Sequence, residues 1–210
     1  MNEFLDHIIW ACDDLERGAR RFEALTGVTP QSGGAHASGL THNALVSLGP
    51  RSYLEILAPT GPPGGTDDAF SRLARTAGEP RVLTYCLRSA RPLPELAQIA
   101  EAMGAPKAEV LKNGRTTPAG VKLHWQWAAP VFDRLGLAFP FFIDWLDSPH
   151  PAATVRPLDM VKLKHFSVGH PLAGELQRLL SAMGAPIATH TAAAGEFRVE
   201  LDTPLGAVSL

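Results

Sequence analysis

The chain has 210 residues, 45% of them hydrophobic, which is enough for one large domain or two small ones around a real core. Its 19 Lys and Arg residues against 21 Asp and Glu give a net charge of −2, and the basic residues are scattered, so neither nucleic acid nor a membrane surface is an expected partner. No apolar run approaches the ~18 residues of a membrane span, and the acidic start lacks a signal-peptide layout, so we expect a cytoplasmic protein.

Residues 1–58 predict one β-α-β-β-β unit. An apolar opening strand carries His7 at its third position and leads directly into a helix with one apolar stripe at helical spacing. A short strand near residues 28–31 follows, and then two longer strand-like runs at residues 41–48 and 52–58. The unit therefore carries an imidazole on its opening strand.

Two further units repeat this order. The second opens without the histidine, whereas the third opens on a strand that carries His165 where the first has His7. The run Ala-Met-Gly-Ala-Pro ends the helix of both units, at residues 102–106 and 182–186, and an identical run at an equivalent position indicates an internal repeat. The predicted organisation is a first module at 1–58, a Gly/Pro-rich connector at 59–80, a second module at 81–148, a connector at 149–161 and a third, shortened module at 162–210.

Several short motifs are spread over roughly the first four-fifths of the chain. They are Leu5-Asp6-His7, Gly33-Gly34-x-His36, Gly39-x-Thr41-x-Asn43, Tyr53-Leu54-Glu55, Gly120-x-x-Leu123-x-Trp125, Pro140-Phe141-Phe142-Ile143-Asp144-Trp145 and His150-Pro151. Together with the repeated unit they resemble the vicinal-oxygen-chelate superfamily, and within it the glyoxalase-like domain proteins. The resemblance implies an α+β fold in which repeated βαβββ modules form an open, curved, mixed β-sheet barrel with helices packed outside. It also implies a divalent metal ion held by histidine and carboxylate side chains from the strands.

Strand alternation selects the first candidate ligands without reference to any family. His7 and Ile9 share one face of the opening strand, opposite Ile8 and Trp10, and Glu55 lies within an apolar strand. A carboxylate in such a strand is costly to bury unless it is paired or bound to a metal. Imidazole and carboxylate together suit Zn, Ni, Mn or Fe. A hydrogen-bonded pair without a metal is the alternative interpretation.

Position within the units adds His165 and Asp144 as further candidate metal ligands, while Thr84 occupies the histidine position of the second unit and departs from the four-ligand pattern of the resemblance. If the histidines of the first and third units converge, those two units face each other. Otherwise the first and second units form the cup. The unit left over is expected to offer an interface for a homodimer, because an exposed sheet edge invites pairing.

The glycine-flanked loop at residues 33–39 predicts a substrate loop, with an ordinary hairpin loop as the alternative. Its histidine, His36, is the candidate catalytic residue beside Glu55. Arg88 and Arg115 are candidates to clamp a carboxylate, but for Arg115 a position at the solvated surface is favoured. The predicted substrate contacts are Thr41, Asn43, His124, Gln126, Arg88 and Trp125.

These residues favour a metal-dependent enzyme acting on a small oxygen-rich molecule. The metal would act as a Lewis acid while a nearby side chain moves a proton. By analogy with the resembled family, isomerase or lyase chemistry is favoured over a dioxygenase. A metal-free protein that sequesters a small molecule, similar to bleomycin-resistance proteins, is the alternative, and a mainly structural or regulatory module is a third. No nucleophile elbow, phosphate-binding loop or HExxH motif is present.

Overall fold

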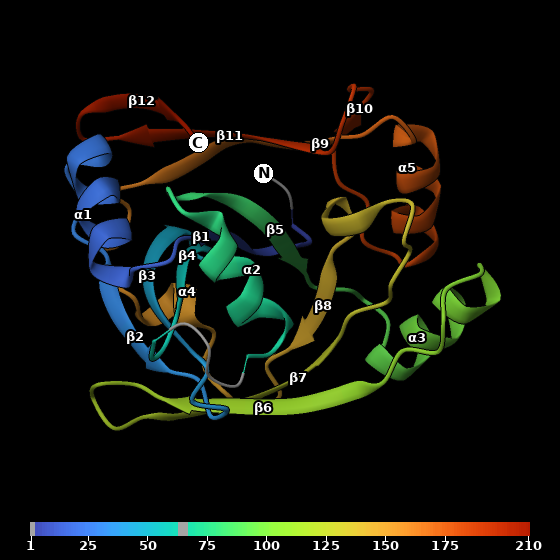
Figure 1. Ribbon diagram of the computed structural model, residues 1–210, viewed down its shortest axis with the longest axis horizontal. Coiled ribbons are helices and arrows are strands. Elements are labelled where there is room, and N and C mark those ends of the chain that lie inside the picture. The colour runs from blue at the N-terminus through green and yellow to red at the C-terminus, as the bar shows by residue number, and fades with distance from the viewer. Residues whose placement is uncertain (1–2, 63–66) are drawn as a thin grey trace.

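The computed structural model describes residues 3–62 and 67–210, and it arranges them as two β-sheets with helices packed against them (Figure 1). In chain order the elements are β1 (Leu5–Ala11), α1 (Leu15–Thr26), β2 (Gln31–Ala35), β3 (Thr41–Gly49), β4 (Ser52–Pro59), α2 (Ala69–Ala77), β5 (Arg81–Leu87), α3 (Leu93–Ala102), β6 (Val110–Thr116), β7 (Lys122–Ala128), the short 3₁₀ helix η1 (Gly136–Ala138), β8 (Phe141–Asp144), α4 (Pro151–Thr154), β9 (Lys162–Gly169), α5 (Ala173–Ala182), β10 (Thr189–His190), β11 (Glu196–Thr203) and β12 (Gly206–Ser209).

The larger sheet combines the first two units in the strand order β2-β3-β4-β1-β5-β8-β7-β6. Strand β1 pairs in parallel with β4 and antiparallel with β5, so it joins the two halves. The edges meet where His36 forms an antiparallel bridge with Arg115. Glycine is required there, because Gly34 has φ +101° and an added Cβ would lie 2.7 Å from the Thr116 carbonyl oxygen. The result is a nearly closed, curved mixed sheet, which confirms the predicted α+β barrel of repeated βαβββ modules.

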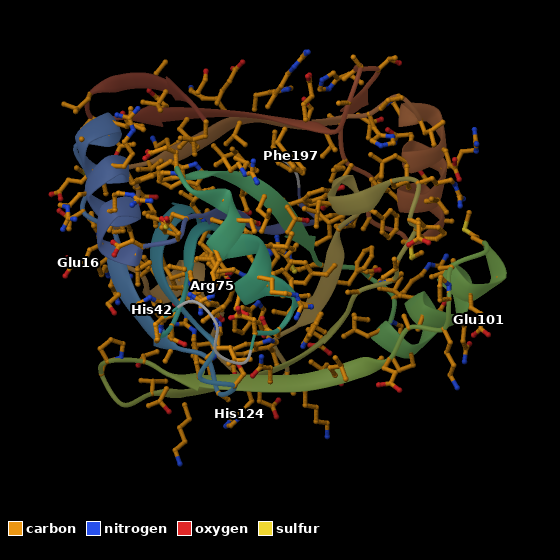
Figure 2. All side chains as sticks on the ribbon, in the orientation of Figure 1. Glu16, His42, Arg75, Glu101, His124 and Phe197 are labelled. Carbon is orange, nitrogen blue, oxygen red and sulfur yellow. The ribbon has the colours of Figure 1, made fainter. Side chains whose placement is uncertain are left out.

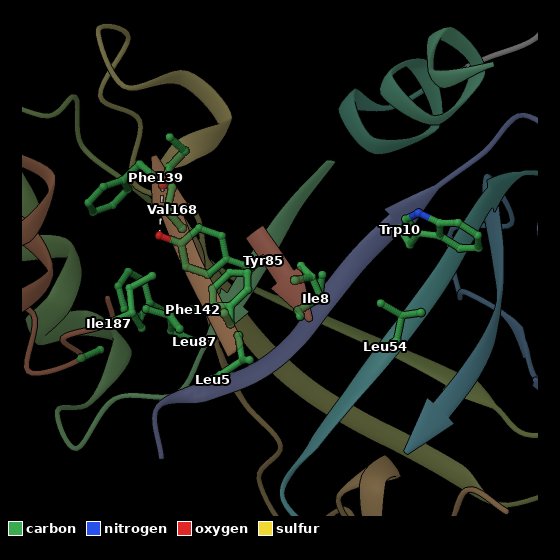
Figure 3. Packing of buried hydrophobic residues seen from close by; sticks show 14 of the residues in the cluster. Leu5, Ile8, Trp10, Leu54, Tyr85, Leu87, Phe139, Phe142, Val168 and Ile187 are labelled. Carbon is green, nitrogen blue, oxygen red and sulfur yellow. Dashed lines mark hydrogen bonds between the residues drawn. The ribbon is translucent and has the colours of Figure 1, made fainter. Parts of the chain in front are cut away.

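The third unit forms a separate four-stranded sheet, β10-β9-β11-β12, on the outer side of the barrel. Tyr85 of β5 contacts Phe166 of β9 with ring centroids 5.1 Å apart. Its hydroxyl donates a hydrogen bond to the Ala138 carbonyl over 3.0 Å, drawn as a dashed line from Tyr85 in Figure 3. The buried residue Val168 of β9 joins the same apolar core as Ile8 of β1. The cup is therefore built from the first and second units, and β9 packs against the barrel's outer face.

The repeated helix ends have the same geometry. After α3 the amide of Ala105 donates to the carbonyl of Ala100 over 2.9 Å, and after α5 the amide of Ala185 donates to that of Leu180 over 3.0 Å. The glycine before each alanine has a positive φ, as the Schellman motif requires. In the described part of the chain, no helix combines the length and apolar character needed to cross a membrane.

Candidate active site

The concave face of the barrel encloses a cavity of about 100 Å³. His7 and Ile9 face it from β1, whereas Ile8 belongs to the core on the opposite side of the strand, as alternation predicts. Aromatic and apolar side chains form much of the wall, namely Tyr53, Phe70, Trp125, Trp127, Phe141, Ile143 and Trp145. Such a lining, with a few polar groups, is typical of a small-molecule site.

His7 is held in one orientation by three neighbours. The register between β1 and β5 shifts just before His7. This irregularity places the Asp6 carboxylate beside the imidazole of His7, with Asp6 Oδ1 2.8 Å from His7 Nδ1. The ring stacks on Tyr53 with centroids 4.7 Å apart. Because Nδ1 carries the proton that Asp6 accepts, Nε2 keeps its lone pair and points to Glu55, whose Oε2 lies 3.4 Å away.

Asp6 is fully buried and receives hydrogen bonds from side chains of distant segments. Besides His7, its carboxylate lies 3.1 Å from His150 Nε2, 3.3 Å from Trp145 Nε1 and 3.2 Å from an Arg88 guanidinium nitrogen. Burial by itself raises the pKa of this carboxyl, but the hydrogen bonds and charges of His150 and His7 outweigh it and hold the pKa far below its ordinary value. Asp6 therefore remains an ionised acceptor that fixes the tautomer of His7.

Glu55 and His36 lie on the other side of that imidazole. Asn43 donates a hydrogen bond to Glu55 Oε1 over 2.7 Å, and its amide nitrogen lies 3.4 Å from His36 Nε2. Because His36 Nε2 accepts from this amide, His36 Nδ1 carries the proton and donates to the Thr41 hydroxyl over 2.7 Å. Burial lowers the pKa of His36, with Arg115 acting in the same direction and Glu55 opposing it. The ring is therefore neutral at pH 7, and its Nε2 lies 3.6 Å from Glu55 Oε1.

Arg115 also lines this cavity and is only 6% exposed, so the prediction of a solvated surface position was wrong. Its guanidinium donates to the carbonyl of Gly33. A Cβ at Gly33 would lie 2.0 Å from Asn43 Oδ1 and 2.6 Å from Arg115 Nη1, so the two side chains flank the same glycine. The glycine-rich loop thus lets a side chain from β6 reach the polar end of the cavity.

The structure does not bring all the predicted site residues together. His165 lies on β9 in the second sheet, where its Nε2 contacts Ser167, because the third unit packs outside the barrel. Asp144 points to the exposed side of β8 and accepts from Gln126 over 3.1 Å.

The predicted substrate contacts on β7 divide between its two faces. Trp125 faces the cavity, whereas His124 and Gln126 alternate with it and point outward; Figure 2 shows His124 on the barrel's outer side. Arg88 does not line the cavity, because its guanidinium is bound to Asp6 and to backbone carbonyls. These side chains therefore lie away from the space where a substrate would bind.

Several functional candidates were missed by the sequence interpretation. Asp6 and Tyr53 stand inside motifs that were noted, but a strand irregularity and a ring stack decide their roles, and neither leaves a sequence signal.

Thr84 is buried and donates its hydroxyl to the Leu137 carbonyl over 3.1 Å, so it supplies no ligand to the cavity.

Each of the two ring nitrogens of His7 lies near side chains that can bind a metal ion. On the Nδ1 side, Asp6, His7 and Cys86 offer ligand atoms within 4.8 Å of one another. Burial raises the pKa of the Cys86 thiol well above its ordinary value, and the Asp6 oxygens already accept several hydrogen bonds, so this group is a poor ligand set. On the Nε2 side, Glu55 lies in the cavity, and an imidazole whose other nitrogen donates to a carboxylate is typical of a metal ligand. His7 and Glu55 fit a divalent cation.

This fold and cavity define a member of the vicinal-oxygen-chelate superfamily. The chain belongs to the family described as "Glyoxalase-like domain", whose model matches residues 5–184. No match was found among the curated proteins.

Solved structures share the fold at low sequence identity. A hypothetical protein from Staphylococcus aureus is 17% identical with a TM-score of 0.64, covering 95% of this chain and 81% of that one. A mutant of 4-hydroxymandelate synthase from Streptomyces coelicolor is 15% identical with a TM-score of 0.53, covering 99% of this chain and 62% of that one. A methylmalonyl-CoA epimerase variant from Streptomyces coelicolor is 19% identical with a TM-score of 0.46, covering 70% and 98%. The first two establish the fold and leave the reaction to be argued from the site.

Proposed function

We propose that this protein is a metal-dependent enzyme of the glyoxalase-like type that acts on a small oxygen-rich substrate by isomerase or lyase chemistry. The observation that supports the proposal most is the orientation of His7. Its Nδ1 is held by the buried Asp6 carboxylate, and its Nε2 faces the Glu55 carboxylate inside a cavity. His7 and Glu55 are the residues that would hold a divalent Zn, Ni, Mn or Fe ion, and the bound ion would polarise a substrate oxygen as a Lewis acid.

His36 is the proposed proton carrier. Its pKa is lowered by burial, so the ring is neutral at pH 7 and its Nε2 can accept a proton from a carbon next to a polarised oxygen. The Thr41 hydroxyl fixes the tautomer by accepting from Nδ1, and Asn43 positions the Glu55 carboxylate. A proton carrier beside the ligands favours an isomerase or lyase over a dioxygenase.

A metal-free small-molecule-binding protein is the second candidate, and the hydrogen bonds of Asn43 favour it. This side chain donates to Glu55 Oε1 and its amide nitrogen also lies beside His36 Nε2, so Asn43 offers both groups a polar partner without a cation. Thr84 supplies no third ligand from β5. In that case the aromatic wall would hold the ligand, and His7 and Glu55 would make only polar contacts.

Metal analysis of protein purified without chelators tests the two candidates. We expect about one divalent ion per chain in the wild type and in His124→Ala, a control that removes an exposed imidazole. We expect the ion to be lost in the His7→Ala, Glu55→Ala double variant. Absence of metal from folded wild-type protein at saturating Zn, Ni, Mn and Fe would contradict the enzyme proposal and favour sequestration.

A further inference from the structure

Arg115 is a cavity residue that the proposed metal chemistry does not use. We propose that it binds the carboxylate of the substrate, so that the cavity takes a small 2-hydroxy or 2-oxo acid. The placement of the second oxygen of that substrate at the His7–Glu55 side rests on the proposed function. The role of Arg115 itself rests on its own burial and contacts.

The guanidinium of Arg115 lacks an acidic partner in the described part of the chain. It is 6% exposed, and no Asp or Glu oxygen of residues 3–62 or 67–210 lies within 4.0 Å of it. The other strongly enclosed arginines are paired, Arg88 with Asp6 at 3.2 Å and Arg75 with Asp67 at 3.0 Å. Among the described residues, the only hydrogen bond of the Arg115 side chain goes to the carbonyl of Gly33. A buried cation without a counter-charge is costly, and the open cavity in front of it is where an anion can supply that charge.

The guanidinium of Arg115 lies close to the side chain of Asn43, which in turn binds Glu55 of the proposed cation site. Arg115 Nη1 and Asn43 Oδ1 flank the same point of the Gly33 backbone, and Asn43 is hydrogen-bonded to Glu55. The carboxylate site is thus separated from the proposed cation site by a single side chain. A carboxylate on the arginine leaves the oxygen of the adjacent carbon facing His7 and Glu55, as in a 2-hydroxy or 2-oxo acid.

The size and walls of the cavity limit the rest of the substrate. At about 100 Å³ the cavity is well below the ~300–1,000 Å³ of drug-sized sites. Trp127, Phe141 and Ile143 form part of its wall and offer no charged group. The remainder of the substrate is therefore a short apolar chain.

Calorimetric titration with a matched pair of ligands tests this proposal. The probes are 2-hydroxybutyrate and its neutral counterpart 2-hydroxybutanamide, each added to zinc-supplemented protein whose metal content is measured in parallel. We expect the wild type to bind the carboxylate roughly 10-fold to 100-fold more tightly than the amide, since hydrogen bonds between charged groups are the stronger ones. Arg115→Gln should lose this preference, while Arg115→Lys should keep part of it.

The amide controls for a structural role of Arg115 at Gly33. If the arginine only supported the loop, Arg115→Gln would weaken both probes by the same factor, and that result would overturn the proposal. Equal affinity of the wild type for both probes, or no binding of either, would also overturn it. Arg20→Gln, which removes an exposed arginine paired with Glu16, should leave both affinities unchanged. A wild type without metal that still prefers the carboxylate would contradict the proposed enzyme function and leave the role of Arg115 supported.

Discussion

Replacement of Asp6 by asparagine probes the orientation of His7 while preserving the shape of the side chain. In the wild type the ionised carboxylate accepts from four groups, the His7, His150 and Trp145 rings and the Arg88 guanidinium. An asparagine side chain has one acceptor oxygen, and its NH₂ group faces donors. The variant therefore leaves Arg88 without its counter-ion and His7 without a fixed tautomer.

The expected magnitude follows from burial. Asp6 is 0% exposed, and removal of one partner from a buried ion pair costs about 3–5 kcal/mol of unfolding free energy. Loss of the carboxylate behind a metal-binding histidine weakens metal affinity by roughly 10-fold to 100-fold. Asp6→Asn should therefore lower both quantities, with the metal affinity falling even under conditions where the variant remains folded.

Competition titration with a zinc chelator and urea unfolding measure the two effects separately. Asp144→Asn is the matched control, because this carboxylate is exposed on β8 and faces away from the cavity. The control should change metal affinity and stability little. A folded Asp6→Asn protein that binds zinc within about threefold of the wild type would refute the inference that Asp6 prepares His7 for a cation.

Three further outcomes are expected. The pKa of Asp6 is held below the ordinary 3.8, so the folded state binds fewer protons than the unfolded state. The free energy of unfolding should therefore fall as pH drops below about 4. Urea unfolding of Asp6→Asn should show a weaker dependence of that free energy on pH in this range. Since burial depresses the pKa of His36 below 6.5, its ring should titrate below pH 6.5 by NMR of metal-free protein, and a midpoint above 6.5 would contradict its neutral role. Gly33→Ala places a methyl group 2.0 Å from Asn43 Oδ1 and should destabilise the fold by about 1–3 kcal/mol in thermal unfolding, whereas Gly174→Ala, in an open helix position, should not.

The sequence alone predicts much of this architecture because its signals are local. Alternation along β1 separates Ile8 from His7, and the repeated Ala-Met-Gly-Ala-Pro run marks two helix ends that have the same hydrogen bonds in the structure. Glu55 reaches the cavity because β4 pairs in parallel with β1, where Ile9 stands opposite Glu55. These features depend on strand period and helix ends, which short windows of residues encode.

The remaining site depends on contacts between distant segments. Arg115 becomes buried only because β2 and β6 meet and close the barrel, which a single strand pattern does not reveal. His124 and Trp125 lie on opposite faces of β7, as alternation predicts, yet the pattern alone does not say which of them faces inward. In the structure Trp125 faces the cavity and His124 is exposed. His165 has the same local sequence setting as His7, but the third unit packs against the outer face of the barrel, away from the cavity. Repetition of a motif therefore does not establish a shared site.

The location of a bound metal ion tests the central claim most directly. Crystals grown with zinc, measured on both sides of its absorption edge, should give one strong anomalous peak in the cavity, within bonding distance of His7 Nε2 and a Glu55 oxygen. A peak on the Nδ1 side of that ring, next to Asp6 and Cys86, or no peak in a zinc-saturated crystal, would contradict the account.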